Sequence, residues 1–268
     1  GPIPVRRHRR DQWPSFVESV TRVLASNGYQ YIDDVNGGER NGFGRVPMTN
    51  TSQHRVSTAM GYLTPEVRRR QNLIVQSEAL VTRLLFEGRR CVGVVVKKAG
   101  REEVFRAGMV VVCAGSYRTP ALLMRSGIGP PDHLRGHGIK PICALPGVGA
   151  NLHDHPTFAA AAHLKLSSMQ PADLRPHANA GLFYSSHVDN CPPYDMYMPI
   201  ANKVGWHALG ERIGALFMVI MKPFSRGCVR LLSSDPNVAP LIEVNAFDDE
   251  RDRVRAVQSM RFAAEILE

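Results

Sequence analysis

The chain of 268 residues lacks the features that mark several large protein classes. No stretch approaches the ~20 uninterrupted apolar residues of a transmembrane helix, so we expect no transmembrane segment. The five cysteines lie far apart and form no CxxC pair, which argues against a structural zinc site. Because an odd number of cysteines favours a reducing compartment, we expect a cytoplasmic protein.

Aromatic residues are also scarce, and none interleave with the basic clusters at residues 6–10, 68–70 and 89–90. The net charge of +9 would otherwise suggest a nucleic-acid partner. Without the aromatic residues of a stacking platform, we interpret these clusters as solvated surface and expect no nucleic acid to bind. A basic nucleic-acid-binding module is kept as an alternative.

The hydrophobic content of 44% is that of a globular protein, and its pattern changes along the chain. Apolar spacing predicts helices over residues 13–27 and 250–267. Between them, short β-like runs separated by Glu87-Gly88 and Ala99-Gly100 predict a three-strand meander over residues 81–105. The Val-rich run 109–113 that follows is typical of a strand buried on both faces.

After Pro156 the pattern indicates a second sheet. Four segments contain alternating or consecutive apolar residues and are separated by prolines, namely residues 158–166, 183–186, 194–198 and 216–221. We expect these runs to form a mainly antiparallel sheet.

Residues 115–129 are the most informative segment. Gly115 follows the predicted buried strand and permits a tight turn with close approach of a ligand. Thr119 and Pro120 are good N-cap and N1 residues, so we expect a helix to begin there, and Gly127 and Gly129 to end it. A strand, a glycine turn and a helix in this order often hold a phosphate or a dinucleotide.

The same residues 115–129 resemble the second sequence signature of the glucose-methanol-choline (GMC) oxidoreductases, a family of FAD-dependent enzymes. The match is in register, from the small residue pair through Thr-Pro to Ser-Gly-Ile-Gly. Three further segments resemble family motifs, at residues 54–63, 147–156 and 227–236. The resemblance therefore spans nearly the whole chain.

The resemblance implies an α/β (α+β) fold, with a partial FAD-binding Rossmann-like domain that carries the β-meander and a substrate domain with a mainly antiparallel sheet. The implied division is 1–43 for a substrate-side helix and loop, 44–157 for the FAD-binding part and 158–268 for the substrate-binding part. The implied function is oxidation of a small-molecule alcohol by hydride transfer to FAD. The implied cofactor-binding residues are Val81, through its backbone, and Ala114, Gly115, Ser116 and Asn151.

Two expected family segments are missing. The chain contains no GxGxxG for the FAD pyrophosphate, and it stops at Glu268 before a segment with the active-site His. We therefore interpret it as an internal fragment, assign no catalytic residue within it, and expect it to be inactive alone. Alternatives are an FAD-containing hydroxynitrile lyase of the same family and a non-catalytic copy.

His153, Asp154 and His155 form the one cluster that suggests metal binding or catalysis. His-x-His on a strand can bind zinc, but Asn151 and Pro156 around it favour a turn in which the side chains diverge. Two ligands without a third make a weak site. We expect a structural role and no metal.

Overall fold

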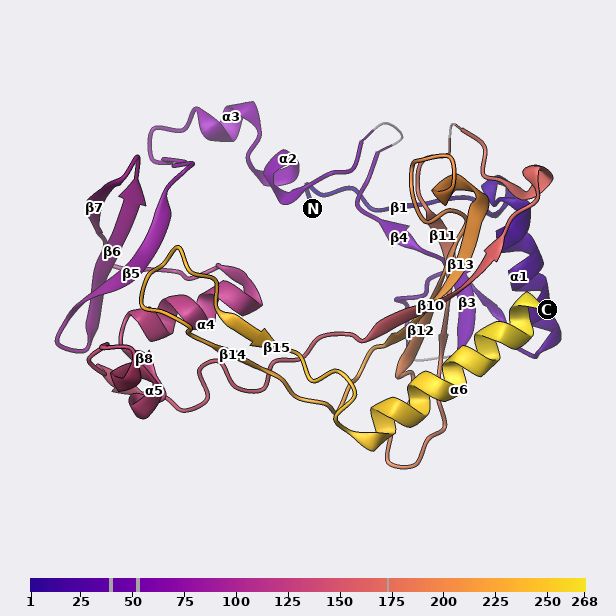
Figure 1. The fold of residues 1–268 in the computed structure, drawn as a ribbon. Coiled ribbons are helices and arrows are strands. Elements are labelled where there is room, and N and C mark those ends of the chain that lie inside the picture. The colour runs from indigo at the N-terminus through magenta and orange to yellow at the C-terminus, as the bar shows by residue number, and fades with distance from the viewer. Residues whose placement is uncertain (39–40, 52–53, 173) are drawn as a thin grey trace. The chain divides into compact units, whose positions relative to one another are not determined.

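The computed structural model describes residues 1–38, 41–51, 54–172 and 174–268 of a mixed α/β chain (Figure 1). These residues form two compact units, each built from separate stretches of sequence. Unit 1 comprises Gly1–Leu73, His155–Phe224 and Phe247–Glu268, and unit 2 comprises Ile74–Asp154 and Ser225–Ala246. The units change at residues 73, 154, 224 and 246, whereas the sequence suggested divisions after 43 and 157. The substrate and cofactor roles of those segments stay predictions.

Unit 1 is organised around a six-stranded sheet in the order β10-β13-β12-β11-β3-β2. All neighbours are antiparallel except β2 and β3, which confirms the mainly antiparallel sheet. The strands are β2 (Tyr31–Ile32), β3 (Gly42–Arg45), β10 (Thr157–His163), β11 (Ala178–Tyr184), β12 (Met196–Ala201) and β13 (Ile213–Ile220).

The two predicted helices are confirmed as α1 (Ser15–Ser26) and α6 (Glu250–Leu267), and they pack in one core with this sheet (Figure 1). Val17 and Leu24 of α1 are fully buried there, and their spacing of two helical turns puts them on the same face of the helix. Met196, Met198 and Ile200 alternate along β12 and are equally buried, as a strand with one covered face requires. Each such side chain contributes about 1.5–3 kcal/mol.

A buried ion-pair network fastens α6 to the sheet. Arg255 is fully buried and forms ion pairs with Asp195, at 2.9 Å, and with Asp252. Asp195 also accepts a hydrogen bond from the backbone N–H of Ser186 at 2.8 Å, and Asp252 accepts one from that of Phe224 at 3.1 Å. Because every charge has partners, the network holds the helix without leaving an isolated buried ion.

Shorter elements complete unit 1. Two-residue strands β1 (Arg6–Arg7) and β4 (Pro47–Met48) pair antiparallel. The helices are α2 (Thr58–Tyr62) and α3 (Pro65–Arg68), with 3-10 turns at Arg10–Gln12, Leu166–Ser168 and Gly210–Arg212. In the described parts of the chain, no helix has both the length and the apolar character that a bilayer span requires.

Unit 2 contains the predicted meander, formed by β5 (Leu80–Glu87), β6 (Arg90–Lys98) and β7 (Arg101–Arg106) in sequential antiparallel order. Two helices follow, α4 (Gly115–Arg125) and α5 (Pro131–Gly136). Two short strand pairs complete the unit, β8 (Ile128–Gly129) parallel to β9 (Cys143–Ala144), and β14 (Cys228–Arg230) antiparallel to β15 (Leu241–Glu243).

The predicted buried strand at residues 109–113 is wrong. These residues belong to no strand, and Met109 and Val111 are 80% and 75% exposed. Cys113, the last residue of this run, is exposed as well. A strand needs a hydrogen-bonding neighbour, and among the described residues none lies beside this run. The run is apolar, but an apolar composition does not by itself provide the neighbouring strand that a strand needs for its backbone hydrogen bonds.

Candidate functional site

The candidate cofactor site begins where α4 starts. The helix begins at Gly115, with Ala114 in the N-cap position, and Pro120 lies inside it. The predicted start at Thr119 and Pro120 is therefore wrong. Gly115 has φ +83°, and this left-handed conformation turns the chain directly into the helix before the cap signals are reached. Pro120 withholds only the N–H that would have bonded to the exposed Ser116 carbonyl.

Ala114, Gly115 and Ser116 are all exposed at this helix end. A Cβ placed on Gly115 would have no atom of the chain within 4 Å, so the backbone is open to close approach from outside. The first-turn N–H groups of a helix lack partners inside the helix and carry partial positive charge. The local arrangement suits an anionic or hydrogen-bond-accepting group.

The loop that carries Asn151 is fixed by the strand β14. A Cβ on Gly149 would lie 2.2 Å from the carbonyl oxygen of Val229, so only glycine fits, and its φ of +79° requires glycine too. The N–H of Val229 donates to the Gly149 carbonyl at 2.7 Å, and Leu152 and Gly227 exchange two backbone bonds. Asn151 follows with φ +57° and is exposed.

One side-chain contact joins the loop to the helix. The Tyr117 hydroxyl, in the first turn of α4, donates to Oδ2 of Asp154 at 3.1 Å. This hydrogen bond, with the carboxylate charge, raises the pKa of Tyr117. Ser116 and Asn151 therefore belong to segments that are directly linked. Tyr117 was not predicted as a site residue. The one sequence signal for it was its position as an aromatic residue close to the glycine turn.

Val81 lies on β5, half-buried and opposite Val96 of β6. The strand β5 is tied to α4 because Ser126 Oγ accepts a hydrogen bond from the Leu84 N–H at 2.8 Å. That bond lies at the C-terminal end of α4, whereas Gly115 lies at the other end. The structure thus joins β5 and α4, and the role of Val81 stays a prediction.

The histidines do not assemble a metal site. No group of three His, Cys, Asp or Glu side chains suited to a metal occurs among the described residues. His153 is exposed, and His133, which lies near it in sequence, has another role. His133 Nε2 accepts a hydrogen bond from the Leu231 N–H at 3.1 Å, and its ring contacts that of His137. Burial chiefly, then the charges of His137 and Arg230, lower the pKa of His133.

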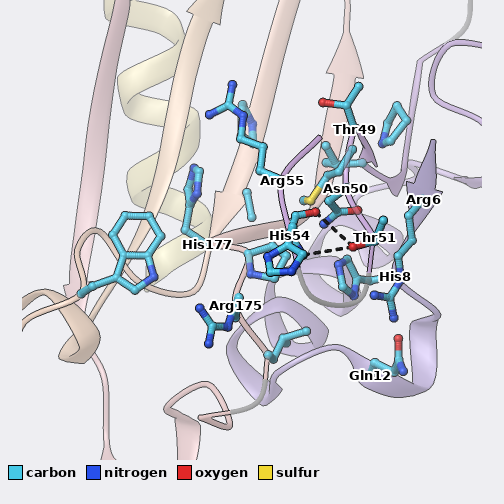
Figure 2. A pocket seen from close by; sticks show the side chains of 18 of the residues that line it. Arg6, His8, Gln12, Thr49, Asn50, Thr51, His54, Arg55, Arg175 and His177 are labelled. Atoms are coloured by element: carbon cyan, nitrogen blue, oxygen red, sulfur yellow. Dashed lines mark hydrogen bonds between the residues drawn. The ribbon is translucent and has the colours of Figure 1, made fainter. Parts of the chain in front are cut away.

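Unit 1 holds a pocket of about 1300 Å³ that sequence reasoning did not find (Figure 2). Its lining comes from sequence-distant segments, including β1, β4 and the residues after it, the start of β11, and Tyr197 and Pro199 of β12. Arg6 and His8 of the basic cluster at 6–10 line this pocket together with Trp206, and no pattern in the sequence indicates that these residues share a pocket.

Comparison with known proteins extends these observations. The N-terminal model of the GMC oxidoreductases matches residues 1–157, and their C-terminal model matches residues 223–268. The oxygen-dependent choline dehydrogenase of Staphylococcus saprophyticus is 34% identical over all of this chain and 51% of its own length. The 5-(hydroxymethyl)furfural oxidase of a Methylovorus species is 33% identical over 97% of this chain and 49% of its own length.

Solved structures show the same fold. Pyridoxine 4-oxidase from Mesorbium loti superposes with a TM-score of 0.85 at 26% identity, covering 99% of this chain and 53% of that one. Formate oxidase from Aspergillus oryzae superposes with a TM-score of 0.86 at 23% sequence identity, and the match covers 100% of this chain and 55% of that chain. The chain thus spans about half the length of the relatives it matches. GMC oxidoreductases are FAD-binding flavoproteins. Because the two family models together match most of its residues, this chain belongs to the GMC oxidoreductase family.

Proposed function

We propose that the full-length protein oxidises the hydroxyl group of a small molecule with FAD as cofactor. The observation that carries this proposal is the open, left-handed Gly115 at the start of α4, in a chain that both family models match. Two relatives are named for choline and 5-(hydroxymethyl)furfural, which are both alcohols. Five free cysteines support a reducing compartment, and we propose the cytoplasm.

The residues present fit FAD. Gly115 leaves room where a side chain would stand, and the backbone N–H groups of Ser116 and its neighbours can donate to the cofactor. Asn151 adds an exposed amide, and the Tyr117–Asp154 bond keeps its loop beside the helix. We assign Ala114 and the backbone of Val81 to the same cofactor. When bound, FAD supplies the acceptor for the hydride from the carbinol carbon.

This chain's own contribution is binding and orientation. A flavin enzyme gains rate when substrate and cofactor are held in a reactive geometry, and rigid elements achieve this better than mobile ones. Gly149 and the backbone bonds between Leu152 and Gly227 fix the loop, so Asn151 has a defined position. We assign no proton transfer to this chain and expect the base in the part of the protein outside it.

The test compares two glycines of the full-length protein. Gly115 and Gly100 have nearly equal φ values, +83° and +82°, and neither would bring a Cβ within 4 Å of another atom. Valine should therefore strain both backbones alike, but only Gly115→Val should exclude the cofactor. We expect flavin absorbance per protein to fall at least tenfold in Gly115→Val and to stay normal in Gly100→Val.

A normal flavin content in Gly115→Val would refute the assigned cofactor site. The reaction is tested separately, by anaerobic addition of choline, 5-(hydroxymethyl)furfural and a panel of other primary alcohols to the wild-type protein. Bleaching of the oxidised flavin band is expected with at least one alcohol. A fully loaded flavin that no alcohol reduces would favour the lyase alternative.

A further inference from the structure

One side-chain hydrogen bond joins the helix α5 to the segment that follows β14. The Leu231 N–H donates to Nε2 of His133 at 3.1 Å, between residues 98 positions apart in the sequence. Both residues belong to unit 2. An imidazole nitrogen accepts a hydrogen bond only when it carries no proton, so the ring in this contact is neutral and its proton lies on Nδ1. The contact therefore requires one protonation state of His133.

The donor of this hydrogen bond is held in a buried position. Leu231 is only 3% exposed and packs in one cluster with Leu134 of α5 and with Ala121 and Met124 of α4. Buried backbone N–H groups are normally hydrogen-bonded, and the loss of a partner costs more than the bond itself contributes. Removal of the acceptor nitrogen of His133 should therefore weaken the packing of this segment against α5.

The same segment holds the loop that carries Asn151. Val229, two residues before Leu231, donates its N–H to the Gly149 carbonyl at 2.7 Å, and Leu152 and Gly227 exchange two backbone hydrogen bonds. Successive hydrogen bonds thus lead from His133 through β14 to this loop. A change in how the end of β14 is held should reach the loop.

Positive charge already surrounds the His133 ring. Its centroid lies 4.8 Å from that of the His137 ring, in an edge-to-face arrangement. Burial first, then the charges of His137 and of Arg230 on β14, lower the pKa of His133. A proton added to this ring would therefore appear next to two other basic groups.

The carboxylates near these basic groups have other contacts. Asp132, adjacent to His133 on α5, forms an ion pair with Arg135 at 2.6 Å. Glu243 of β15 accepts a hydrogen bond from the Cys228 thiol at 3.1 Å, and Nε of Arg230 donates to the same sulfur at 3.4 Å. Neither carboxylate forms an ion pair with His133 in the described part of the chain. The surroundings thus favour the neutral imidazole.

We propose that His133 is a pH-sensitive switch, which holds the end of β14 against α5 when it is neutral and releases it when Nε2 takes a proton from solvent. An imidazolium donates from both nitrogens and accepts at neither, so the Leu231 N–H loses this acceptor. The new positive charge repels Arg230, one residue away on the same segment. Through β14 the release loosens the loop that carries Asn151. Every group in this switch belongs to unit 2, so the switch does not depend on FAD.

The switch opens towards acid. Above the ordinary histidine pKa of 6.5, the ring is neutral in the folded and in the unfolded chain, and the hydrogen bond contributes fully. Below 6.5 the unfolded chain binds the proton first, because the pKa of the folded ring is lower. Stability therefore falls as the pH falls, until the folded ring is protonated as well.

The experiment is hydrogen–deuterium exchange of the full-length protein, followed by mass spectrometry of peptides that cover residues 147–152 and 227–232. Exchange is measured between about pH 7.5 and pH 5 and corrected for the pH dependence of the intrinsic rate. Protection of the Leu231 amide should fall about tenfold across this range in the wild type, because the N–H loses its acceptor. Protection of residues 147–152 should fall over the same pH interval.

Two substitutions separate the switch from general acid destabilisation. His133→Gln places an amide oxygen near the position of Nε2 and can accept at every pH, so Leu231 should stay protected down to pH 5. His163→Gln, at an exposed position of β10, should keep the pH dependence of the wild type. His133→Ala should lose the protection of Leu231 even at pH 7.5.

NMR of the full-length protein labelled with ¹⁵N-histidine gives a second measurement. At neutral pH the signal that disappears in His133→Gln should show the proton on Nδ1. The proposal is overturned if the protection of Leu231 does not change with pH, if His133→Gln and His163→Gln have the same pH dependence, or if the ring carries its neutral proton on Nε2. Release of Leu231 with unchanged protection of residues 147–152 would overturn the link to the loop.

Discussion

The two units use apolar residues differently. In unit 1, Leu182 and Met198 are fully buried between the sheet and its two helices. In unit 2, Met109 and Val111 have the same apolar character and are largely exposed, and the buried cluster around Met124 is small. The difference shows that apolar side chains become buried only where another element packs against them. In unit 1 the helices α1 and α6 cover the sheet in this way.

The largest expected effect tests what holds unit 1 together. Arg255→Gln removes the cation between Asp195 and Asp252, so each of these buried carboxylates loses an ion pair. The free energy of unfolding should fall by about 3–5 kcal/mol. Urea denaturation followed by far-UV circular dichroism measures it, with Arg261→Gln on the exposed side of the same helix as control. Equal urea midpoints for the two variants would show that the ion-pair network does not contribute to the stability of unit 1.

A matched pair of truncations addresses the comparison directly. Leu182→Ala opens a cavity in a fully buried position of β11 and should cost about 2–5 kcal/mol. Val111→Ala changes an exposed side chain and should cost less than about 0.5 kcal/mol. Both are measured by urea denaturation of the 268-residue chain. A cost for Val111→Ala near that of Leu182→Ala would mean that residues 109–113 are buried in solution.

Alkaline pH should weaken unit 1 through Tyr197. Burial raises the pKa of Tyr197 to about 12, from an ordinary value of 10.0. Below pH 10 both states keep the proton and stability is unaffected. Between pH 10 and 12 the unfolded chain loses the proton while the folded chain keeps it, so stability falls as pH rises, by about 1.4 kcal/mol at pH 11. Tyr197→Phe should remove the contribution of Tyr197 and leave that of Tyr184, whose pKa burial also raises, whereas the exposed Tyr62→Phe should change neither.

The smallest effect is expected at the histidines of unit 2 and its boundary. His153→Gln and His155→Gln change exposed side chains beside Asp154. If the general base lies outside this chain, turnover of the full-length enzyme should fall far less than the ~10²–10⁴-fold that loss of a base produces. Steady-state kinetics with flavin content measured in parallel checks this. A loss of several orders of magnitude at full flavin occupancy would assign the base to this segment.

Local signals predicted the elements that depend on local contacts. Glycines at the hairpin tips predicted the meander β5–β7, and the apolar spacing of residues 250–267 predicted α6. Thr119 and Pro120 were misleading, because the left-handed Gly115 starts the helix first. Gly115 was recognisable from a turn signal, whereas the contact between Tyr117 and Asp154 joins residues far apart in sequence. The pocket around His8 was not predictable for the same reason.

The order in which unit 1 is encoded has a consequence for its biosynthesis. The strand β3 pairs with β11, and α1 shares its core with Ala263 and Ile266 of α6, while all of Ile74–Asp154 lies between them in the sequence. A nascent chain emerging from the ribosome therefore presents α1 and β3 long before their partners exist. Pairings of such long range close slowly and leave apolar surface open to aggregation. We expect newly made protein to depend on chaperones until α6 has been translated.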